Sequence, residues 1–256
     1  MSDQIRYGLF FDTETTGLAN FNKPAVDPDQ PKLAQIGGLL MDLQERKELG
    51  TIDLIVYPSS WEIPQEAALV HGISTKLAQI AGVNLDSALL AFDDMIQIAD
   101  VVVAHNYAFD RIVIERAFAM IALANGEDVL SHLDDKRYFD TMKVATPVVK
   151  KRGKKPLHND DYKWPKLTET YEFLFGKGFS GAHNAIIDVR ACAEVFFRLI
   201  DMGYGGDEYA HLMRGDVDSL PGYDDNLKAD LEALLSLYAK AGKVKLPTIV
   251  FDGDAA

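Results

Sequence analysis

Near its start the chain carries the stretch FFDTETTGL, Phe10 to Leu18, in which two acidic residues interrupt an apolar run. Apolar residues lead in from Ile5, which is typical of a buried strand. Asp12 and Glu14 are two positions apart, so on a strand both carboxylates point to the same face. Two like charges placed side by side repel, and burying them costs more unless a cation lies between them. The pattern therefore indicates a cation-binding pair.

Two predicted helices each turn one aspartate toward the core in the first turn. In the segment 107–123, Asp110 shares its stripe with Ile114, Ala117 and Ile121. In the segment 185–201, Asp188 heads a stripe of Cys192, Val195 and Leu199. Helical spacing directs both stripes to the core. A helix N-terminus stabilises an anion by only ~0.3–1 kcal/mol, which does not offset the burial of a carboxylate.

Each of these four acidic residues, taken singly, could be a helix cap or one half of an ion pair. As a set, they stand at the ends of predicted strands or the heads of predicted helices, where α/β folds place their sites. Hard oxygen ligands without cysteine select Mg²⁺ or Mn²⁺. Four carboxylates suit a pair of divalent ions ~3.5–4 Å apart, as in phosphoryl-transfer sites.

The pattern of strands and helices predicts an α/β fold. Strand-like runs at 5–12, 33–42 and 49–57 are close enough in sequence to form an antiparallel meander, and 18–32 reads as an exposed loop. Further short strands are expected at 101–105 and 137–141, among helices at 65–70, 74–81, 85–98, 107–123, 166–175, 185–201 and 226–241. We therefore expect a mixed β-sheet, an antiparallel meander plus parallel strands, flanked by α-helices. We divide the chain into a core domain, 1–202, and a C-terminal helical extension, 203–256.

Composition narrows the class of protein. With 48% hydrophobic and 25% charged residues the chain is typical of a globular protein, and no apolar run is long enough to span a membrane. The first strand starts too early to leave room for a targeting leader. A single cysteine, Cys192, excludes an internal disulfide, and no Cys/His set forms a zinc site. These features favour an intracellular, cytoplasmic protein with no membrane partner.

The net charge of the chain does not decide which partners it binds. The net charge of −13 argues against non-specific affinity for nucleic acid. The segment 143–155, KVATPVVKKRGKK, nevertheless carries six basic residues and no acidic one. With Lys150, Lys151 and Arg152 at its centre, we expect a basic loop. It could be a solvated loop, a localisation signal, or a grip on the phosphates of a substrate.

Three motifs give the sequence a family resemblance. DTETTGL at 12–18, AHNYAFD at 104–110 and AHNAIIDVRA at 182–191 resemble the exonuclease motifs of the DEDD superfamily. His183 stands five residues before Asp188, as in the DEDDh (DnaQ-like) branch, and Asn184 occupies the place of the sister branch's tyrosine. VHGIS at 70–74, FDT at 139–141 and KLTETYEFLFG at 166–176 also match. The resemblance implies a ribonuclease-H-like fold and the removal of nucleotides from 3′ ends.

The resemblance also implies roles for the catalytic residues, which would be Asp12, Glu14, Asp110, His183 and Asp188. The four carboxylates would hold two Mg²⁺ or Mn²⁺ ions. Asp12, Glu14 and Asp188 would hold the ion that binds the attacking water, and Asp12 would bridge to a second ion, supported by Asp110, at the leaving 3′-oxygen. His183 would be the general base, because an unperturbed imidazole pKa of about 6.5 lies near working pH.

By the same resemblance, Thr15, Thr16, Leu18, His71 and Asn106 would contact the substrate. The two threonines would offer backbone amides, and Leu18 an apolar wedge, to the last base. Alternatives remain open: the segment after Glu14 could only turn the chain out of the strand, and His71 could be a structural histidine. We expect a structural role for His105.

The expected partner is a nucleic acid with a free 3′ end, single-stranded DNA in the first place. The same chemistry on RNA or oligoribonucleotides is the nearest rival, because the 2′-OH is read by the shape of the pocket. Two further functions stay open. The chain could be a proofreading subunit that docks a polymerase or repair partner through 203–256, or a binding module that kept the fold without catalysis.

Overall fold

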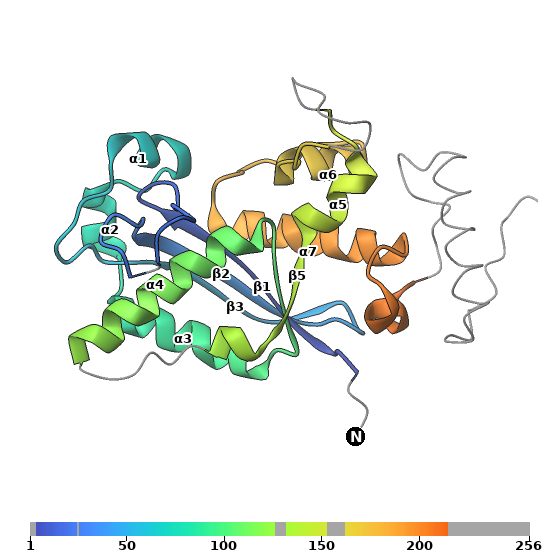
Figure 1. The fold of residues 1–256 in the computed structure, drawn as a ribbon, viewed down its shortest axis with the longest axis horizontal. Helices are drawn as coiled ribbons and strands as arrows, with labels where there is room; N and C mark the ends of the chain where they lie inside the picture. The colour runs from blue at the N-terminus through green and yellow to red at the C-terminus, as the bar shows by residue number, and fades with distance from the viewer. Residues whose placement is uncertain (1–3, 25, 126–131, 153–161, 215–256) are drawn as a thin grey trace, which may run out of the picture.

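The computed structural model of the chain describes residues 4–24, 26–125, 132–152 and 162–214. A five-stranded sheet forms its centre, in the order β3-β2-β1-β4-β5 (Figure 1). The strands are β1 (Tyr7–Thr15), β2 (Leu33–Asp42), β3 (Lys47–Ile55), β4 (Val101–Ala104) and β5 (Arg137–Asp140). β1, β2 and β3 pair antiparallel, whereas β4 and β5 continue the sheet parallel to β1. The predicted mixed sheet is confirmed.

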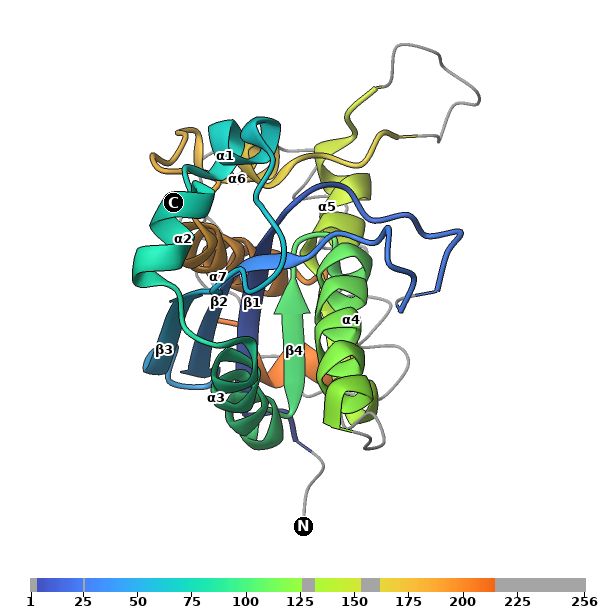
Figure 2. The same ribbon diagram turned by 90° about the vertical axis from the view of Figure 1, so that its left-hand side faces the viewer.

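Helices cover both faces of this sheet. The longer elements are α3 (Leu85–Ile98), α4 (Tyr107–Asn125), α5 (Thr141–Val149), α6 (Leu167–Phe175) and α7 (Ala185–Asp201). The shorter ones are α1 (Gln65–His71), α2 (Thr75–Ala81) and the 3₁₀ turns η1 (His132–Asp135) and η2 (Asp207–Leu212). In Figure 2, α3 and α4 lie in front of the sheet and α7 lies behind it. None of the helices within the described ranges combines the length and apolar character needed to cross a membrane.

The alternation of side chains along β1 divides the core. Phe10 packs with Phe196 of α7 on one face, and Phe11 packs with Phe92 of α3 on the other. β1 continues beyond the predicted end at residue 12, because it stays paired with β2 as far as Thr15, with an irregular register after Glu14. The same alternation therefore places Asp12 and Glu14 on the face that carries α7.

The predicted loop over 143–155 is wrong in its first half, because residues up to Val149 belong to α5. The Asp140 side chain caps this helix by accepting from the amides of Met142 and Lys143. Met142, Ala145 and Val148 are buried along one stripe. Cap and stripe stabilise a helix despite Pro147 and the β-branched content. The non-helical segment begins only at Lys150, whose φ of 49° ends α5.

The described part of the predicted extension packs on the core. Tyr209 and Leu212 of η2 are buried in the same cluster as α7, where Tyr209 meets Phe139 and Phe196. Residues 215–256, which include the helix predicted at 226–241, lie outside the described residues. The division of the chain at residue 202 therefore stays a prediction.

Candidate active site

Four acidic side chains converge where β1 and β4 end. Asp12 and Glu14 project from β1, Asp110 from the first turn of α4, and Asp188 from the first turn of α7. Asp110 and Asp188 are buried, at 2% and 8% exposure. The parallel pairing of β1 with β4 brings these segments to one edge of the sheet, because α4 starts directly after β4.

Asp110 is held by the strand that carries the other carboxylates. The pairing of β1 with β4 ends at Phe10, so the backbone of Thr13 has no strand partner on the side of β4. Both the amide and the hydroxyl of Thr13 donate to Asp110 Oδ1, at 2.9 and 2.7 Å. Thr13 points to the opposite face from Asp12, so it fixes Asp110 without occupying the pocket. Sequence patterning did not identify this residue, because a buried threonine on a strand is usually core packing.

The start of α7 presents His183 and Asp188 together. The His183 amide donates to Asp188 Oδ2 at 2.7 Å, and Asn184 caps the helix. Single ligand atoms of Glu14, His183 and Asp188 lie within 4.8 Å of one another, a geometry that could hold a metal ion. This group differs from the expected set, in which Asp12 rather than His183 joined Glu14 and Asp188.

Burial raises the pKa of all four carboxyl groups, and repulsion between them adds to the rise at Asp12 and Glu14. Burial, followed by the charges of Asp110, Glu14 and Asp188, raises the pKa of Asp12 well above its ordinary value. Burial and then the charges of Asp188 and Asp110 raise the pKa of Glu14 to about 7. The pKa of Asp110 also rises to about 7 through burial, although the Thr13 hydrogen bonds oppose the change.

Burial raises the pKa of Asp188 too, against the effect of the His183 amide. Within the described residues, no lysine or arginine forms an ion pair with any of the four carboxylates. A dense set of oxygen ligands with elevated pKa values and no cationic side chain fits a divalent cation such as Mg²⁺ or Mn²⁺.

A further carboxylate, Asp140, is buried next to this group. Its Oδ1 accepts from the amides of Asn106, Met142 and Lys143, at 3.1–3.3 Å, and its Oδ2 has no hydrogen-bond partner within the described residues. Its charge also raises the pKa of Asp110. Asp140 thus ties the β4–α4 turn to the start of α5. Its position at the end of a short strand is the signal that could have identified it.

Three of the residues expected to contact the terminal nucleotide lie at or just after the end of β1, and they differ in their hydrogen bonds and exposure. The Thr15 hydroxyl donates to Gly17 O at 2.6 Å. The Thr16 amide donates to Lys32 O at 3.0 Å, so this amide already has a partner within the protein. The bond supports the alternative that this segment only turns the chain out of the strand. Leu18 is 90% exposed and free to contact a ligand.

His71, Asn106 and His105 have distinct surroundings. His71 is buried close to Thr15 and His183. Burial lowers its pKa, and its Nε2 lacks a hydrogen-bond partner within the described residues. Asn106 has a φ of 79° and shapes the β4–α4 turn. His105 bonds to Thr141 Oγ1 at 2.9 Å and Pro165 O at 3.0 Å, which confirms its structural role.

Among the described residues of the basic segment, a lysine is already paired with a carboxylate. Lys151 pairs with Glu169, and its carbonyl accepts from the Lys163 amide at 2.8 Å. Lys150 and Arg152 are exposed. The described residues that follow α5 lie at the end of the sheet where β1 and β4 terminate (Figure 2), and the other basic residues, Lys154 and Lys155, lie outside the described residues.

Comparisons with solved structures show the same fold. A zinc-bound complex of E. coli exonuclease I with single-stranded DNA matches with a TM-score of 0.59 and 21% identity, over 78% of this chain and 41% of that one. The apo form of exonuclease I matches with 0.57 and 20%, over 81% and 44%. Exonuclease I from Methylocaldum szegediense matches with 0.56 and 18%, over 80% and 42%. The chain thus spans less than half the length of these proteins. No curated protein sequence matches it.

The mixed sheet, with acidic residues gathered at the ends of β1 and β4, is of the ribonuclease-H-like class. The sequence model of the RNase_T family, described as exonuclease, matches residues 9–196. The chain belongs to this exonuclease family, as the three motifs and His183 indicated.

Proposed function

We propose that this protein is a divalent-metal-dependent 3′–5′ exonuclease that removes nucleotides from single-stranded DNA. The observation that carries the proposal is the convergence of Glu14, Asp188 and His183 beside Asp12 and Asp110, in a member of an exonuclease family. A cation bound among these carboxylates would favour their ionised form, which burial and mutual repulsion otherwise disfavour.

In this proposal Asp12, Glu14, Asp110 and Asp188 hold two Mg²⁺ or Mn²⁺ ions. Bound there, the ions would supply a lowered pKa for water and charge neutralisation at the leaving 3′-oxygen. A ring nitrogen of His183, exposed at the rim, accepts the proton from the attacking water. His71 Nδ1 accepts from the Ile73 amide at 3.1 Å, so the proton of the neutral ring is on Nε2, which donates a hydrogen bond at the terminal nucleotide.

The ligands of structurally similar proteins favour DNA as the substrate. Exonuclease I structures of the same fold contain dA16 and dT13 oligonucleotides. The acidic net charge of −13 disfavours the many phosphate contacts of a long duplex and suits a short, single-stranded end. RNA and oligoribonucleotides remain the rival, and a direct comparison decides between them.

The test is a digestion with defined ends. Matched DNA and RNA oligomers, single- and double-stranded and labelled at either the 5′ or the 3′ end, are incubated with Mg²⁺, Mn²⁺ or chelator. We expect a ladder from 5′-labelled single-stranded DNA, early release of label from the 3′ end, and no product in chelator. Faster digestion of RNA would reassign the substrate, and release from the 5′ end would reverse the polarity.

Asp12→Ala links the activity to this site. We expect a loss of roughly 10³-fold or more, since Asp12 lies among the other three carboxylates. Asp86→Ala, an exposed acidic residue on α3, is the matched control and should keep the parental rate. Parental digestion by Asp12→Ala would show that the activity arises elsewhere.

A further inference from the structure

Between β1 and β2 the chain leaves the sheet and forms an arm, residues 16–24 and 26–32, that extends past α4 at the end where β1 and β4 terminate (Figure 2). Its base is closed by a reciprocal pair of hydrogen bonds. The Thr16 amide donates to Lys32 O at 3.0 Å, and the Lys32 amide donates to Thr16 Oγ1 at 2.9 Å. The arm therefore begins two residues after Glu14, and these two hydrogen bonds fix its base.

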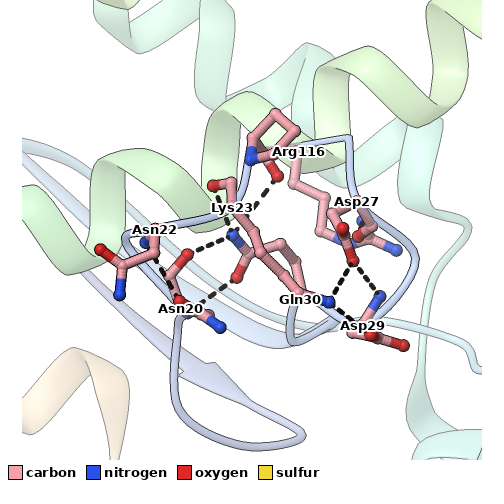
Figure 3. A network of polar contacts seen from close by, with 8 residues as sticks. Asn20, Asn22, Lys23, Asp27, Asp29, Gln30 and Arg116 are labelled. Atoms are coloured by element: carbon pink, nitrogen blue, oxygen red, sulfur yellow. Dashed lines mark hydrogen bonds and ion pairs between the residues drawn. The ribbon is translucent and has the colours of Figure 1, made fainter.

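One buried amide side chain fills the inside of the arm. Gln30 is 2% exposed. Its Nε2 donates to the carbonyls of Asn20, Lys23 and Pro24, at 2.8, 3.1 and 3.3 Å, and its Oε1 accepts from the Asn20 amide at 2.9 Å (Figure 3). A single side chain thus fixes both sides of the turn that contains residues 20–24.

A second set of contacts fixes the outer half of the arm to α4. Lys23 Nζ pairs with Asp27 at 3.2 Å and with Asp29 at 2.5 Å. Arg116 of α4 donates to the Asp27 carbonyl. Arg116 lies on the same helix as Asp110, so the arm and one of the site's carboxylates share a rigid element.

Despite this bracing, the arm exposes apolar side chains. Leu18 is 90% and Phe21 is 60% exposed. An aromatic ring held in water on a fixed backbone is poised for contact, because the backbone entropy of ordering it is already lost on folding. Lys23 is committed to two carboxylates, so this region suits stacking on a flat group better than binding a phosphate.

We propose that Phe21 is a base-stacking residue of this nuclease, and that Gln30 is the positioning residue that holds it in place. The inference rests on the proposed function, because it takes its ligand, a nucleobase near the strand end, from that function. Aromatic rings stack on any base without regard to sequence. An unpaired base offers its ring faces to Phe21 most readily, so the contact favours single-stranded or frayed ends over paired ends.

The experiment measures binding and turnover separately. Binding is followed by fluorescence anisotropy with labelled oligo-dT of about 15 nucleotides in chelator, where the strand is not degraded. We expect Phe21→Ala to weaken binding about tenfold, and to raise KM similarly with kcat nearly unchanged. Phe21→Trp should restore both. Leu123→Ala, an equally exposed apolar residue at the far end of α4, is the control and should bind as the parent does.

A double variant tests the role of Gln30. Gln30→Ala should raise KM with kcat nearly unchanged, and Phe21→Ala/Gln30→Ala should be no worse than Phe21→Ala, because both act through the same contact. Additive losses would mean that Gln30 affects binding independently of Phe21, which would overturn its role as a positioning residue. Parental binding by Phe21→Ala would overturn the inference while leaving metal-dependent digestion intact. A parent that binds oligo-dT through Phe21 but digests nothing would instead overturn the proposed function alone.

Discussion

His183 has a φ of 67°, a left-handed backbone conformation that is uncommon outside glycine, although histidine adopts it more readily than most residues. The conformation is held by the hydrogen bond from its amide to Asp188 Oδ2, so strain in the loop is stabilised by a carboxylate of the site itself. The exposed imidazole lies in one group with Glu14 and Asp188. Two roles fit this geometry, a general base that stays free of metal or a further metal ligand.

A substitution of His183 separates these roles. His183→Asn keeps the backbone, because asparagine tolerates positive φ. For a general base we expect kcat to fall by roughly 10²–10⁴, while the rise in Tm caused by Mn²⁺ stays at the parental value. The measurements are single-turnover digestion and thermal unfolding with and without Mn²⁺. Loss of the Mn²⁺ effect together with activity would make the imidazole a metal ligand.

Residue types and spacing selected Asp12, Glu14, Asp110 and Asp188 from the sequence, and the family resemblance added His183. The residues that hold them were not visible. Thr13 bonds to Asp110 across 97 positions of sequence, and the link from Asp140 to Asn106 exists only once β4 and β5 are paired. Periodicity reports which face a side chain takes, and it carries no information on which distant group that side chain meets.

At the level of elements, the distance between α7 and the sheet depends on Gly37. A Cβ built on Gly37 of β2 would lie 2.7 Å from the carbonyl carbon of Ala185 and 2.9 Å from its Cβ. Ala185 is the first residue of α7, one turn before Asp188. The helix end that carries His183 and Asp188 is therefore pressed directly on the backbone of β2.

Gly37→Ala should displace this end of α7. We expect a loss of about 1–3 kcal/mol in the free energy of unfolding and a fall in kcat of up to roughly 100-fold, because Asp188 moves relative to Asp12 and Glu14. Gly38→Ala is the matched control on the next residue, where the new Cβ meets the Ile52 side chain at 2.9 Å. Chemical denaturation and digestion rates check both. Equal effects of the two variants on activity would mean that the contact between Gly37 and Ala185 does not position the site.

Long amphipathic patterns predicted their elements well, and local contacts explain the misses. The stripe of Cys192, Val195 and Leu199 is buried, as α7 required. α5 was missed because its pattern is short, contains Pro147, and depends on a cap supplied by Asp140 from the preceding strand. The loop between β1 and β2 was predicted as exposed, yet its order comes from Gln30, a polar residue whose burial no local pattern indicates.

For the molecule as a whole, the acidic site opposes folding when no cation is bound. Carboxyls with raised pKa values keep protons in the folded state that the unfolded state releases, so stability falls as pH rises. For Glu14 and Asp110 this stability is fully present below their ordinary pKa values near 4. It is lost as pH rises through their folded pKa values of about 7. The net charge of −13 adds repulsion in the same direction.

We therefore expect the metal-free protein to be more stable at pH 5.5 than at pH 8, by on the order of 2 kcal/mol or roughly 5 °C in Tm. Mn²⁺ should raise Tm more at pH 8, where it meets ionised carboxylates, than at pH 5.5, where it competes with protons. Thermal unfolding in chelator and in Mn²⁺ at both pH values measures this. Glu14→Gln should flatten the pH dependence and reduce the Mn²⁺ effect, while Asp86→Asn, on the exposed surface, should change neither. A Tm that rises with pH in chelator, or an equal Mn²⁺ effect at both pH values, would mean that the carboxylates are not the repelling cluster that the fold brings together.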